Sequence, residues 1–354
     1  MILPPSVPVA ESCPPTYLTD VNESRKTKQR AVNQHHTPCL HLRRFCGETP
    51  KNMVWAYDIE RGKARPSRVE ECGAQKNFYS VQRDDGTFND ELDDWLQGVE
   101  TNAAAPYEQL LNGVIPQGQA RADFSTFVSS LYLRSPAILR AYAEAAGKLA
   151  QQTIDFAWRT RKQFEKSMDR FEAEEGAMKV PRDEVWEYFQ DKDGYKVQVE
   201  HRAAFGVMAA SDDIQTILFN RHWYLLEAAD GFFITSDSPV QRFTDPQFHY
   251  GPMGDGGFMN PAAEVTLPLS PRFGLLITGQ AAQSNYVRLG ADDVWRMNQQ
   301  RALGALRFLY ASVKDDRISA LAEAHKHDGP GVQVSGGPTM VEVEVLRLGR
   351  PGRA

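Results

Sequence analysis

The sequence predicts an α+β fold, in which a mostly helical middle region packs on a small, mainly antiparallel sheet. Strand-like segments rich in β-branched and aromatic residues cluster before residue 82 and again after residue 221. Between them, apolar residues recur with the 3.6-residue period of helices. Because strands and helices do not alternate regularly along the chain, a doubly wound parallel sheet is not expected.

The first strands are expected to form a hairpin. The segment from Met53 to Ile59 is rich in strand-forming residues, and Arg61-Gly62-Lys63 supplies the turn into a second short strand. A further apolar and aromatic patch, NFYSV, begins at Asn77.

The middle of the chain is expected to be helical. After Asp90 a first helix places Leu92, Leu96 and Val99 on one face, and a second carries apolar residues from Phe124 to Tyr132. Pro136 interrupts it, since proline disfavours helical backbone in the residue before it. One long third helix is then predicted from about Ala137 to Gly176, with a charged, solvated second half. Two shorter helices are expected in DEVWEYFQ and over residues 201–219.

The last third of the domain returns to strands. HWYLLEA and FFITS, joined by Ala229-Asp230-Gly231, predict a second hairpin. A long loop from Ser236 to about Pro261 follows, and EVTLPLSP and RFGLLITG predict two more strands. A helix is expected in ADDVWRMNQQRALGAL, with Asp292 or Asp293 as its N-cap, before a final strand, RFLYAS.

Three regions are therefore expected. Residues 1–30 are proline-rich and predict a disordered arm, residues 31–313 a single α+β domain, and residues 314–354 a terminal helix and a loose, glycine-rich tail.

Composition limits the functional classes. The 354 residues are 42% hydrophobic and carry a net charge of −6, which is unlike a dedicated duplex-DNA binder but does not exclude a nuclease. No run of about 18 apolar residues predicts a membrane helix, and the start of the chain lacks the features of a secretory signal. A cytoplasmic location is the expectation, with all four cysteines free or metal-bound.

The stretch NQHHTPCLHLRRF, residues 33–45, is the first candidate for a site. Structural zinc fits poorly, because Cys39 and Cys46 lie seven positions apart and no second close pair exists. Alternatively, the stretch packs through its apolar residues and leaves His41 and the arginines on the surface. In a third interpretation, His35 is a general acid or base, or a metal ligand, and the arginines hold a phosphate or carboxylate.

Three later polar residues are further candidates. Asp237 lies where an apolar strand opens onto the long loop, although Ser-Asp-Ser-Pro is also an ordinary turn. Asn298 shares the apolar face of its helix, so it is either a clamp on the backbone or part of a polar site. Glu100 lies at the edge of an apolar face and requires a cation, which Arg134 or an arginine of residues 33–45 could supply.

No strong short motif is present. The sequence lacks the P-loop, HExxH and GxSxG patterns and has no well-placed GxGxxG, which lowers the odds of the corresponding chemistries.

The chain resembles a bacterial family catalogued as domain of unknown function 4238. His35, Pro38, Leu42 and Phe45 look like its opening motif, and the order and spacing of later features fit from about residue 33 to about 312. These later features are Phe78-Tyr79-Ser80, Val99-Glu100, Leu133-Arg134-Ser135-Pro136, Thr235-Ser236-Asp237-Ser238-Pro239, Pro268-Leu269-Ser270-Pro271 and Asn298. His36 stands where the family usually has an aromatic residue. The resemblance implies a shared polar site and names no activity.

The leading hypothesis is an intracellular metal-dependent hydrolase of phosphoesters or nucleic acids. His35 would be base or metal ligand, Asp237 and Glu100 would bind a divalent ion or orient His35, and Arg43, Arg134 and Asn298 would bind substrate. The alternative is a non-catalytic protein-interaction module, with the aromatic loop containing Phe243, Phe248, Tyr250 and Phe258 as its contact region. A third possibility is that His35 and Arg44 merely tie the N-terminal segment to the helices.

Overall fold

The computed structural model describes residues 33–47, 52–82, 87–177, 180–191, 197, 205–251, 254–326, 331–335 and 342–346. The chain divides into two units, residues 1–32 and 33–354, and the described residues all belong to the second, which is compact. The arm predicted for residues 1–30, together with Cys13, therefore lies outside the described residues.

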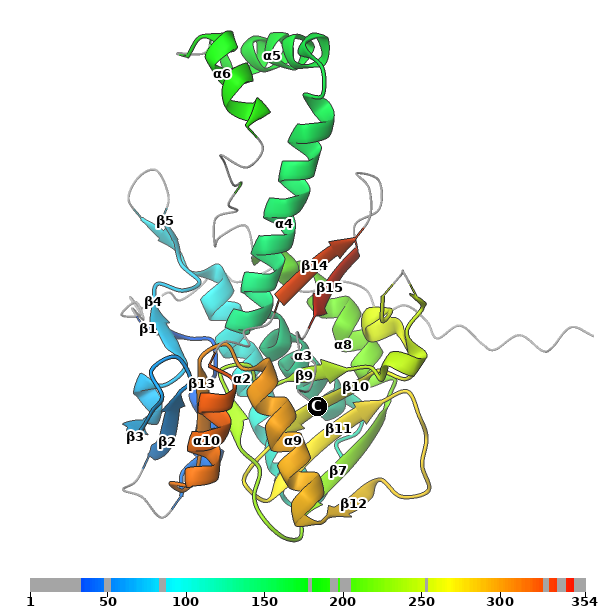
Figure 1. The fold of residues 1–354 in the computed structure, drawn as a ribbon. Helices are drawn as coiled ribbons and strands as arrows, with labels where there is room; N and C mark the ends of the chain where they lie inside the picture. Colours follow the sequence, from blue (N-terminus) through cyan, green and yellow to red (C-terminus); the bar gives the residue numbers. More distant parts are fainter. Residues whose placement is uncertain are drawn as a thin grey trace, which may run out of the picture. The chain divides into compact units, whose positions relative to one another are not determined.

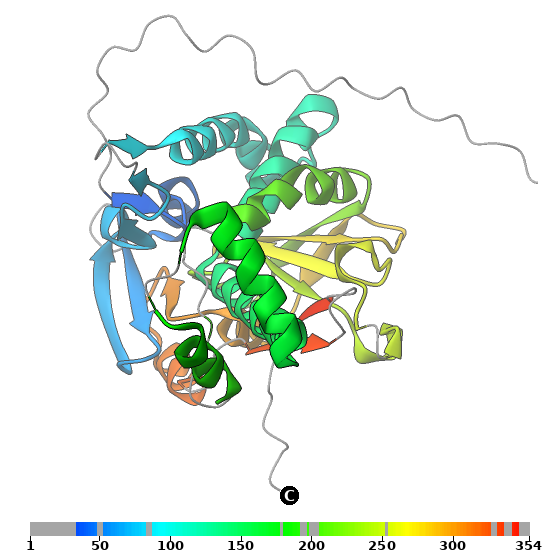
Figure 2. The same ribbon diagram turned by 90° about the horizontal axis from the view of Figure 1, so that it is seen from above.

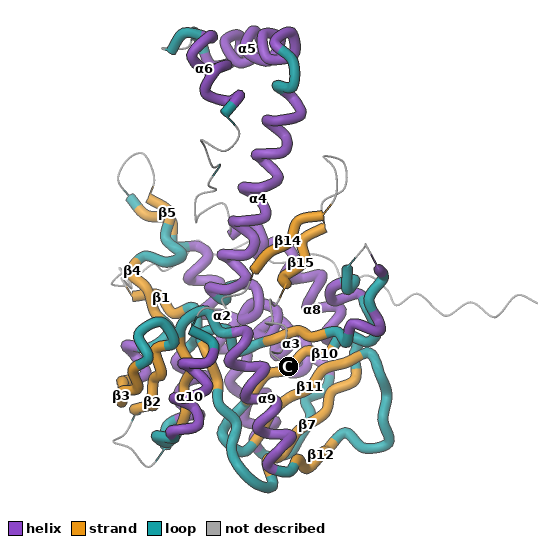
Figure 3. Tube along the Cα trace, in the orientation of Figure 1, coloured by secondary structure: helices purple, strands orange, loops and turns teal. Residues whose placement is uncertain are grey.

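Two sheets organise the second unit, and the predicted α+β class is confirmed (Figures 1 and 3). The five-stranded sheet has the order β12-β7-β11-β10-β9, in which β12 and β7 pair in parallel and the other neighbours are antiparallel. Its strands are β7 (His222–Ala228), β9 (Gln241–Phe243), β10 (Glu264–Pro268), β11 (Phe273–Thr278) and β12 (Tyr286–Leu289).

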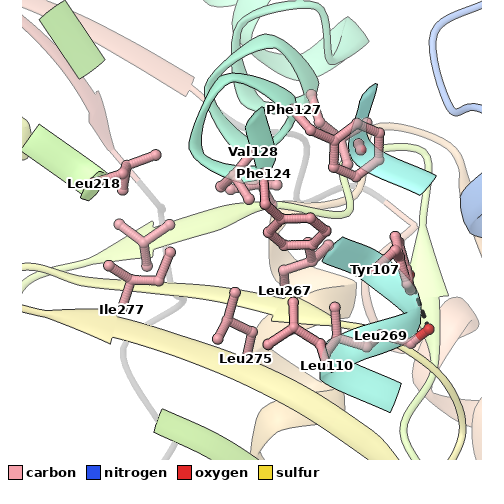
Figure 4. Packing of buried hydrophobic residues seen from close by; sticks show 14 of the residues in the cluster. Tyr107, Leu110, Phe124, Phe127, Val128, Leu218, Leu267, Leu269, Leu275 and Ile277 are labelled. Atoms are coloured by element: carbon pink, nitrogen blue, oxygen red, sulfur yellow. Dashed lines mark hydrogen bonds between the residues drawn. The ribbon is translucent and has the colours of Figure 1, made fainter. Parts of the chain in front are cut away.

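Helices cover both faces of this sheet. Alternate residues of β7 face opposite sides: Trp223 and Leu225 pack against α2 (Glu91–Leu111), α3 (Gly118–Leu133) and α8 (Ser211–Phe219). Tyr224 and Leu226 instead pack towards α9 (Ala291–Gly304). Figure 2 shows these helices on the two sides of the sheet, and Figure 4 shows the larger core beneath α2 and α3. The predicted helices over 92–103, 124–132 and 291–306 are confirmed.

The four-stranded sheet has the order β3-β2-β13-β8 and is antiparallel throughout. It consists of β2 (Met53–Asp58), β3 (Lys63–Arg68), β8 (Thr235–Ser236) and β13 (Phe308–Ala311), with α10 (Asp316–Ala324) packed on one face. The other face covers the segment after β1 (Asn33–His35), namely α1 (Cys39–Leu42) and a 3-10 helix, η1 (Arg43–Phe45). The predicted β2–β3 hairpin is confirmed, and Gly62 provides the left-handed turn position with φ 61°.

The second predicted hairpin is wrong. Both edges of β7 are occupied, by β11 and β12, so the chain after Gly231 has no free edge of β7 to pair with. It crosses instead to the other sheet, where β8 pairs with β13. The two strands predicted after residue 263 and the last strand are confirmed as β10, β11 and β13.

The predicted long third helix is two helices. α4 (Pro136–Ala157) ends at Trp158, and α5 (Arg161–Glu175) begins after Thr160, whose hydroxyl accepts from Gln163 N at 3.3 Å. α4 leads away from the sheets and carries α5 and α6 (Arg182–Gln190) at its far end (Figures 1 and 3). There Trp158 and Phe164 begin a separate aromatic cluster that includes Trp186 and Phe189.

Several smaller elements complete the unit. β1 pairs with β4 (Ala74–Lys76), β5 (Val81–Gln82) with β6 (Phe88–Asn89), and β14 (Gly331–Ser335) with β15 (Glu342–Leu346). The last pair lies in the tail for which the sequence predicts no regular structure. The remaining elements are the 3-10 helices η2 (Val69–Glu71), η3 (Phe205–Ala210), η4 (Pro246–Phe248) and η6 (Gly257–Met259).

Two details differ from expectation. The helix predicted over 201–219 is η3 followed by α8, with residues 201–204 outside the description, and the N-cap of α9 is Gly290 rather than Asp292 or Asp293. Asp292 and Asp293 lie in the first helical turn, where acidic side chains also complement the helix dipole. Among the described helices, none is long and apolar enough to cross a membrane.

Candidate functional site

His35 ends β1, and Pro38 turns the chain into α1 three residues later. The imidazole is half-buried, and its Nε2 lies 3.3 Å from the carbonyl oxygen of Glu70. A carbonyl only accepts, so Nε2 carries the proton and the lone pair is on Nδ1. Burial lowers the pKa of His35, which keeps the ring neutral at pH 7 and makes Nδ1 a competent base.

Cys39 also contacts His35, with its sulfur 3.4 Å from Nε2. This is the distance of a nucleophile–base pair, but Nε2 already donates to Glu70. Burial also raises the pKa of Cys39 to about 11, and its S–H is directed at the Val69 carbonyl at 3.8 Å. Cys39 is therefore a protonated, unactivated thiol in this arrangement.

Arg134 ends α3, and its side chain is only 1% exposed. Its Nη1 donates to Oε1 of Glu100 at 2.9 Å, so the ion pair anticipated for Glu100 is present. Nε and Nη2 are buried, and among the described residues neither has a hydrogen-bond acceptor. The Tyr79 hydroxyl donates to the His35 carbonyl at 3.4 Å, and burial raises its pKa against the lowering effect of the neighbouring Arg134 guanidinium. Arg134 is thus a buried cation with part of its donor set unused.

Glu100 and Asp93 are two carboxylates whose charges act on His35. The side chain of Glu100 is 26% exposed and connects the buried guanidinium to solvent. Asp93 precedes Glu100 by two helical turns on α2, is partly buried, and accepts from Gln97 Nε2 at 2.9 Å. Burial raises the pKa of Asp93, and its charge, like that of Glu100, acts on His35. His35, Asp93, Glu100, Arg134 and Tyr79 are named the Arg134 cluster below.

His36 lies behind this cluster. Its ring is buried against Phe78, with ring centroids 5.5 Å apart, and Nδ1 lies 3.2 Å from Thr37 Oγ1. Burial, and to a lesser extent the nearby positive charge of Arg134, together lower the pKa of His36 to about 3. His36 is therefore a neutral core residue whose ring packs against Phe78.

Arg43 lies at the rim of the same region. Glu70 links it to His35, because the Glu70 carbonyl is the partner of His35 while its carboxylate lies 3.5 Å from Arg43 Nη2. Both side chains of this ion pair are about half exposed. Arg43 is consequently free to reorient towards a ligand at little cost.

Asp237 is turned away from the Arg134 cluster. Its buried carboxylate accepts from the backbone N–H groups of Leu306, Arg307 and Phe308 at 2.9, 2.7 and 3.0 Å. Burial raises its pKa to about 6, against the lowering effect of these donors. Only its backbone approaches residues 35–37, where Thr37 Oγ1 donates to the Asp237 carbonyl at 3.4 Å. The observed contacts are those of a clamp that fixes the start of β13.

Asn298 also makes the contacts of a clamp. Its Oδ1 accepts from Ile234 N at 3.0 Å and its Nδ2 donates to Phe232 O at 2.8 Å, so it ties α9 to the segment before β8. Of the two alternatives that the sequence leaves open for Asn298, these are the contacts expected of a backbone clamp.

His41 is fully buried, so its interpretation as a surface residue is wrong. Its Nδ1 lies 2.9 Å from the Tyr107 hydroxyl and its Nε2 lies 2.7 Å from Thr235 Oγ1. Because Tyr107 donates to the Leu269 carbonyl (Figure 4), it accepts from His41, and the proton is on Nδ1. Burial lowers the pKa of His41 to about 3, so this neutral ring joins α1, α2 and β8.

The sequence held partial signals for these contacts. His41 precedes Phe45 by four residues, the spacing that places two side chains on one helical face, and their rings lie 5.2 Å apart. Asp93 is two turns before Glu100 on the same helix, which spacing alone could have indicated. Nothing in the sequence indicated that Asp237 would be turned towards backbone N–H groups about 70 residues away.

A bound metal ion would require several ligating side chains close together in the described ranges. These ranges contain no group of three or more His, Cys, Asp or Glu side chains arranged to hold a metal ion, and Cys39, Cys46 and Cys72 are free thiols. The structural-zinc interpretation of residues 33–45 therefore receives no support from these residues.

Comparison with known protein families gives a match over most of the chain. A family model described as "Protein of unknown function (DUF4238)" matches residues 33–315, which is most of the chain. No curated protein and no solved structure shows significant similarity.

Proposed function

The chain belongs to the family of proteins of unknown function DUF4238, whose description names no activity, so we propose a function from the side chains themselves. The protein binds a ligand that carries a phosphate or similar anionic group, and Arg134 holds that group. His35, Tyr79 and Glu100 surround it.

The observation that supports this proposal is the set of guanidinium donors on Arg134 that lack a hydrogen-bond acceptor in the described part of the chain. A buried donor without an acceptor costs about 1–3 kcal/mol, and more when the group is charged. Within the described ranges, Arg134 has two such donors, Nε and Nη2, and it pairs with Glu100 through Nη1. An anionic ligand group would satisfy the remaining donors, because the guanidinium fork matches phosphate and carboxylate oxygens in pairs.

The reaction that we propose for this site is hydrolysis of a phosphoester, in a small molecule or a nucleic acid. Arg134 would hold the phosphoryl oxygens, and Arg43 at the rim would add positive charge. Nδ1 of neutral His35 would take a proton from the attacking water and return it to the alcohol oxygen that leaves as the P–O bond breaks. We assign no step to a metal ion, since the described residues bring no suitable group of ligands together.

The experiment is a thermal-shift screen of the wild type with inorganic phosphate, nucleotides, short oligonucleotides, divalent cations and EDTA. A ligand that binds only the native state raises its apparent stability by mass action. We expect phosphate-bearing ligands to raise the melting temperature of the wild type and not that of Arg134→Met. Arg140→Met is the matched control, because Arg140 lies on the next helix, is 57% exposed and pairs only locally with Glu144.

The outcomes separate binding from hydrolysis. If the shift with phosphate persists in Arg134→Met, the anion binds elsewhere and the proposal is wrong. If Arg134→Met loses the shift while His35→Ala retains both the shift and any phosphoesterase activity of the wild type, the protein binds anions but His35 is not its base.

A second candidate function, protein interaction through the aromatic loop, is favoured by a separate observation. Phe243, Phe248 and Tyr250 are 37%, 44% and 54% exposed, whereas Phe258 packs edge-on against Tyr132 with ring centroids 4.9 Å apart. Exposed aromatic side chains are typical of partner-binding surfaces. Protein interaction would become the preferred function if no anion stabilised the wild-type protein.

A further inference from the structure

We infer that Glu100 occupies the position of the ligand's anionic group on Arg134 and must leave the guanidinium when the ligand binds. In this view Glu100 is a competing internal anion rather than a catalytic residue. The inference rests on the proposed function, because it concerns the same guanidinium.

The relative exposure of the two side chains supports this order of events. Arg134 is 1% exposed and Glu100 is 26% exposed, so the carboxylate lies on the solvent side of the pair. An anion that approaches from solvent therefore meets Glu100 before it meets Arg134. The buried donors Nε and Nη2 cannot be reached while the side chains keep these positions, since their own exposure is close to zero.

The contact itself is suited to exchange. Glu100 is joined to Arg134 by a single hydrogen bond, from Nη1 at 2.9 Å, and not by the two parallel bonds of a bidentate pair. A phosphate offers three oxygens and more negative charge, so it can engage Nη1 and Nη2 together where Glu100 engages only Nη1. The displaced carboxylate has access to water, which reduces the cost of its leaving.

The surrounding charges favour the exchange as well. Asp93 lies on the same face of α2 as Glu100, and the two carboxylates repel each other. When the ligand takes over Arg134, Glu100 can move outwards and away from both the ligand and Asp93. Because the resident carboxylate competes, weakly charged ligands are disfavoured, and the site selects groups with two negative charges over those with one.

The opposite role for Glu100 makes the opposite prediction. If Glu100 bound a divalent ion or oriented His35, as the sequence hypothesis holds, removing its charge would weaken ligand binding or leave it unchanged. If Glu100 competes with the ligand, removing its charge strengthens binding.

The test is isothermal titration of inorganic phosphate into the full chain as wild type, Glu100→Gln, Asp93→Asn and Arg134→Met. Glu100→Gln keeps an acceptor for Arg134 but lacks the charge, and we expect it to bind phosphate about tenfold more tightly than the wild type. Asp93→Asn is the matched control, since it removes the same charge from the same helix face without touching Arg134, and we expect a change of about twofold at most.

Arg134→Met separates the two claims. If it abolishes binding while Glu100→Gln and a second variant, Glu100→Ala, bind phosphate no better than the wild type, Glu100 is not a competitor, although the proposed function stands. If Asp93→Asn strengthens binding as much as Glu100→Gln, the effect is a general field effect and the inference is also wrong. If phosphate binds to none of the five proteins, the proposed function itself fails.

Discussion

Two buried polar regions of the domain differ in how completely their hydrogen bonds are made. The carboxylate of Asp237 accepts from three backbone N–H groups, and Asn298 uses both its oxygen and its nitrogen on backbone. Arg134 uses one of its donors on a partly exposed glutamate and leaves two others without an acceptor in the described part of the chain.

This difference separates buried polar groups that stabilise the fold from buried polar groups that can bind a ligand. A buried polar group whose hydrogen bonds are complete stabilises the fold and has nothing left to offer a ligand. A buried cation with unused donors contributes less to stability and retains the capacity to bind. We therefore expect different effects from substitutions in the two regions: loss of stability at Asp237, and loss of ligand binding at Arg134.

The largest effect is expected from Asp237→Asn. The amide presents one oxygen and one NH₂ group where the backbone offers three donors, so at least one N–H loses its acceptor and faces another donor. We expect the free energy of unfolding, measured by urea denaturation, to fall by about 3–5 kcal/mol. A loss below about 1 kcal/mol would show that the clamp does not hold β13, and the contrast with Arg134 would disappear.

The second largest effect is expected on the unfolding free energy when the pH is lowered. The folded-state pKa values of His36 and His41 are about 3, below the usual value of about 6.5, so the unfolded chain binds more protons between these values. Their contribution is present above pH 6.5 and is lost as pH falls. The pKa of Asp237 is raised to about 6, so it opposes this trend between about pH 6 and pH 4.

At about 1.4 kcal/mol per pH unit for each group, the two histidines outweigh the aspartate. We expect the unfolding free energy to be lower by about 3 kcal/mol at pH 5 than at pH 7. His36→Phe sharpens the test, because it places an aromatic ring against Phe78 and removes one of the two titrations. Equal pH dependence in the variant and the wild type would exclude His36 as a buried neutral group.

A smaller effect on stability is expected from Arg134→Met. Methionine replaces the apolar stem, removes two unsatisfied donors and leaves Glu100 with access to water. We therefore expect the unfolding free energy to change by about 1 kcal/mol or less in chemical denaturation. A loss as large as that of Asp237→Asn would mean that Arg134 is a structural clamp of the same kind.

The smallest effect is expected from Arg43→Ala. Its ion pair with Glu70 is about half exposed on both sides, with 3.5 Å between Nη2 and Oε1. We expect a change in stability of about 0.5 kcal/mol or less and a modest loss of anion affinity that shrinks as salt is added. Affinity that is unchanged at low salt would remove Arg43 from the rim of the site.

Much of the fold was predictable because local patterns decided it. The β2–β3 hairpin, the apolar faces of α2 and α3, and the strands β10 and β11 follow from periodicity and turn residues. The second hairpin was not predictable, because it failed for a non-local reason: β11 and β12 occupy both edges of β7. The division of the long helix at Trp158 depends on tertiary packing in the same way, since its ring packs on Phe164 and Phe189.

The candidate site was predictable in part. A cation partner for Glu100 was expected from a carboxylate at the edge of an apolar face, and Arg134, one of the two alternatives that the sequence left open, is that partner. The charges of both groups act on His35. Residue type alone could not separate Asp237 and Asn298 from this cluster, because the direction of a side chain depends on which backbone groups the fold brings near it. The burial of His36 and His41 was likewise hidden by their polarity in a segment that contains two arginines.

The most direct measurement is a crystal structure of the wild-type chain with selenate, whose anomalous scattering locates an anion without prior assumptions. We predict a selenate within hydrogen-bond distance of Nη2 of Arg134, with the carboxylate of Glu100 moved away from Nη1. Selenate bound only elsewhere, with Arg134 still paired to Glu100 alone, would contradict the assignment of Arg134 as the anion-binding residue.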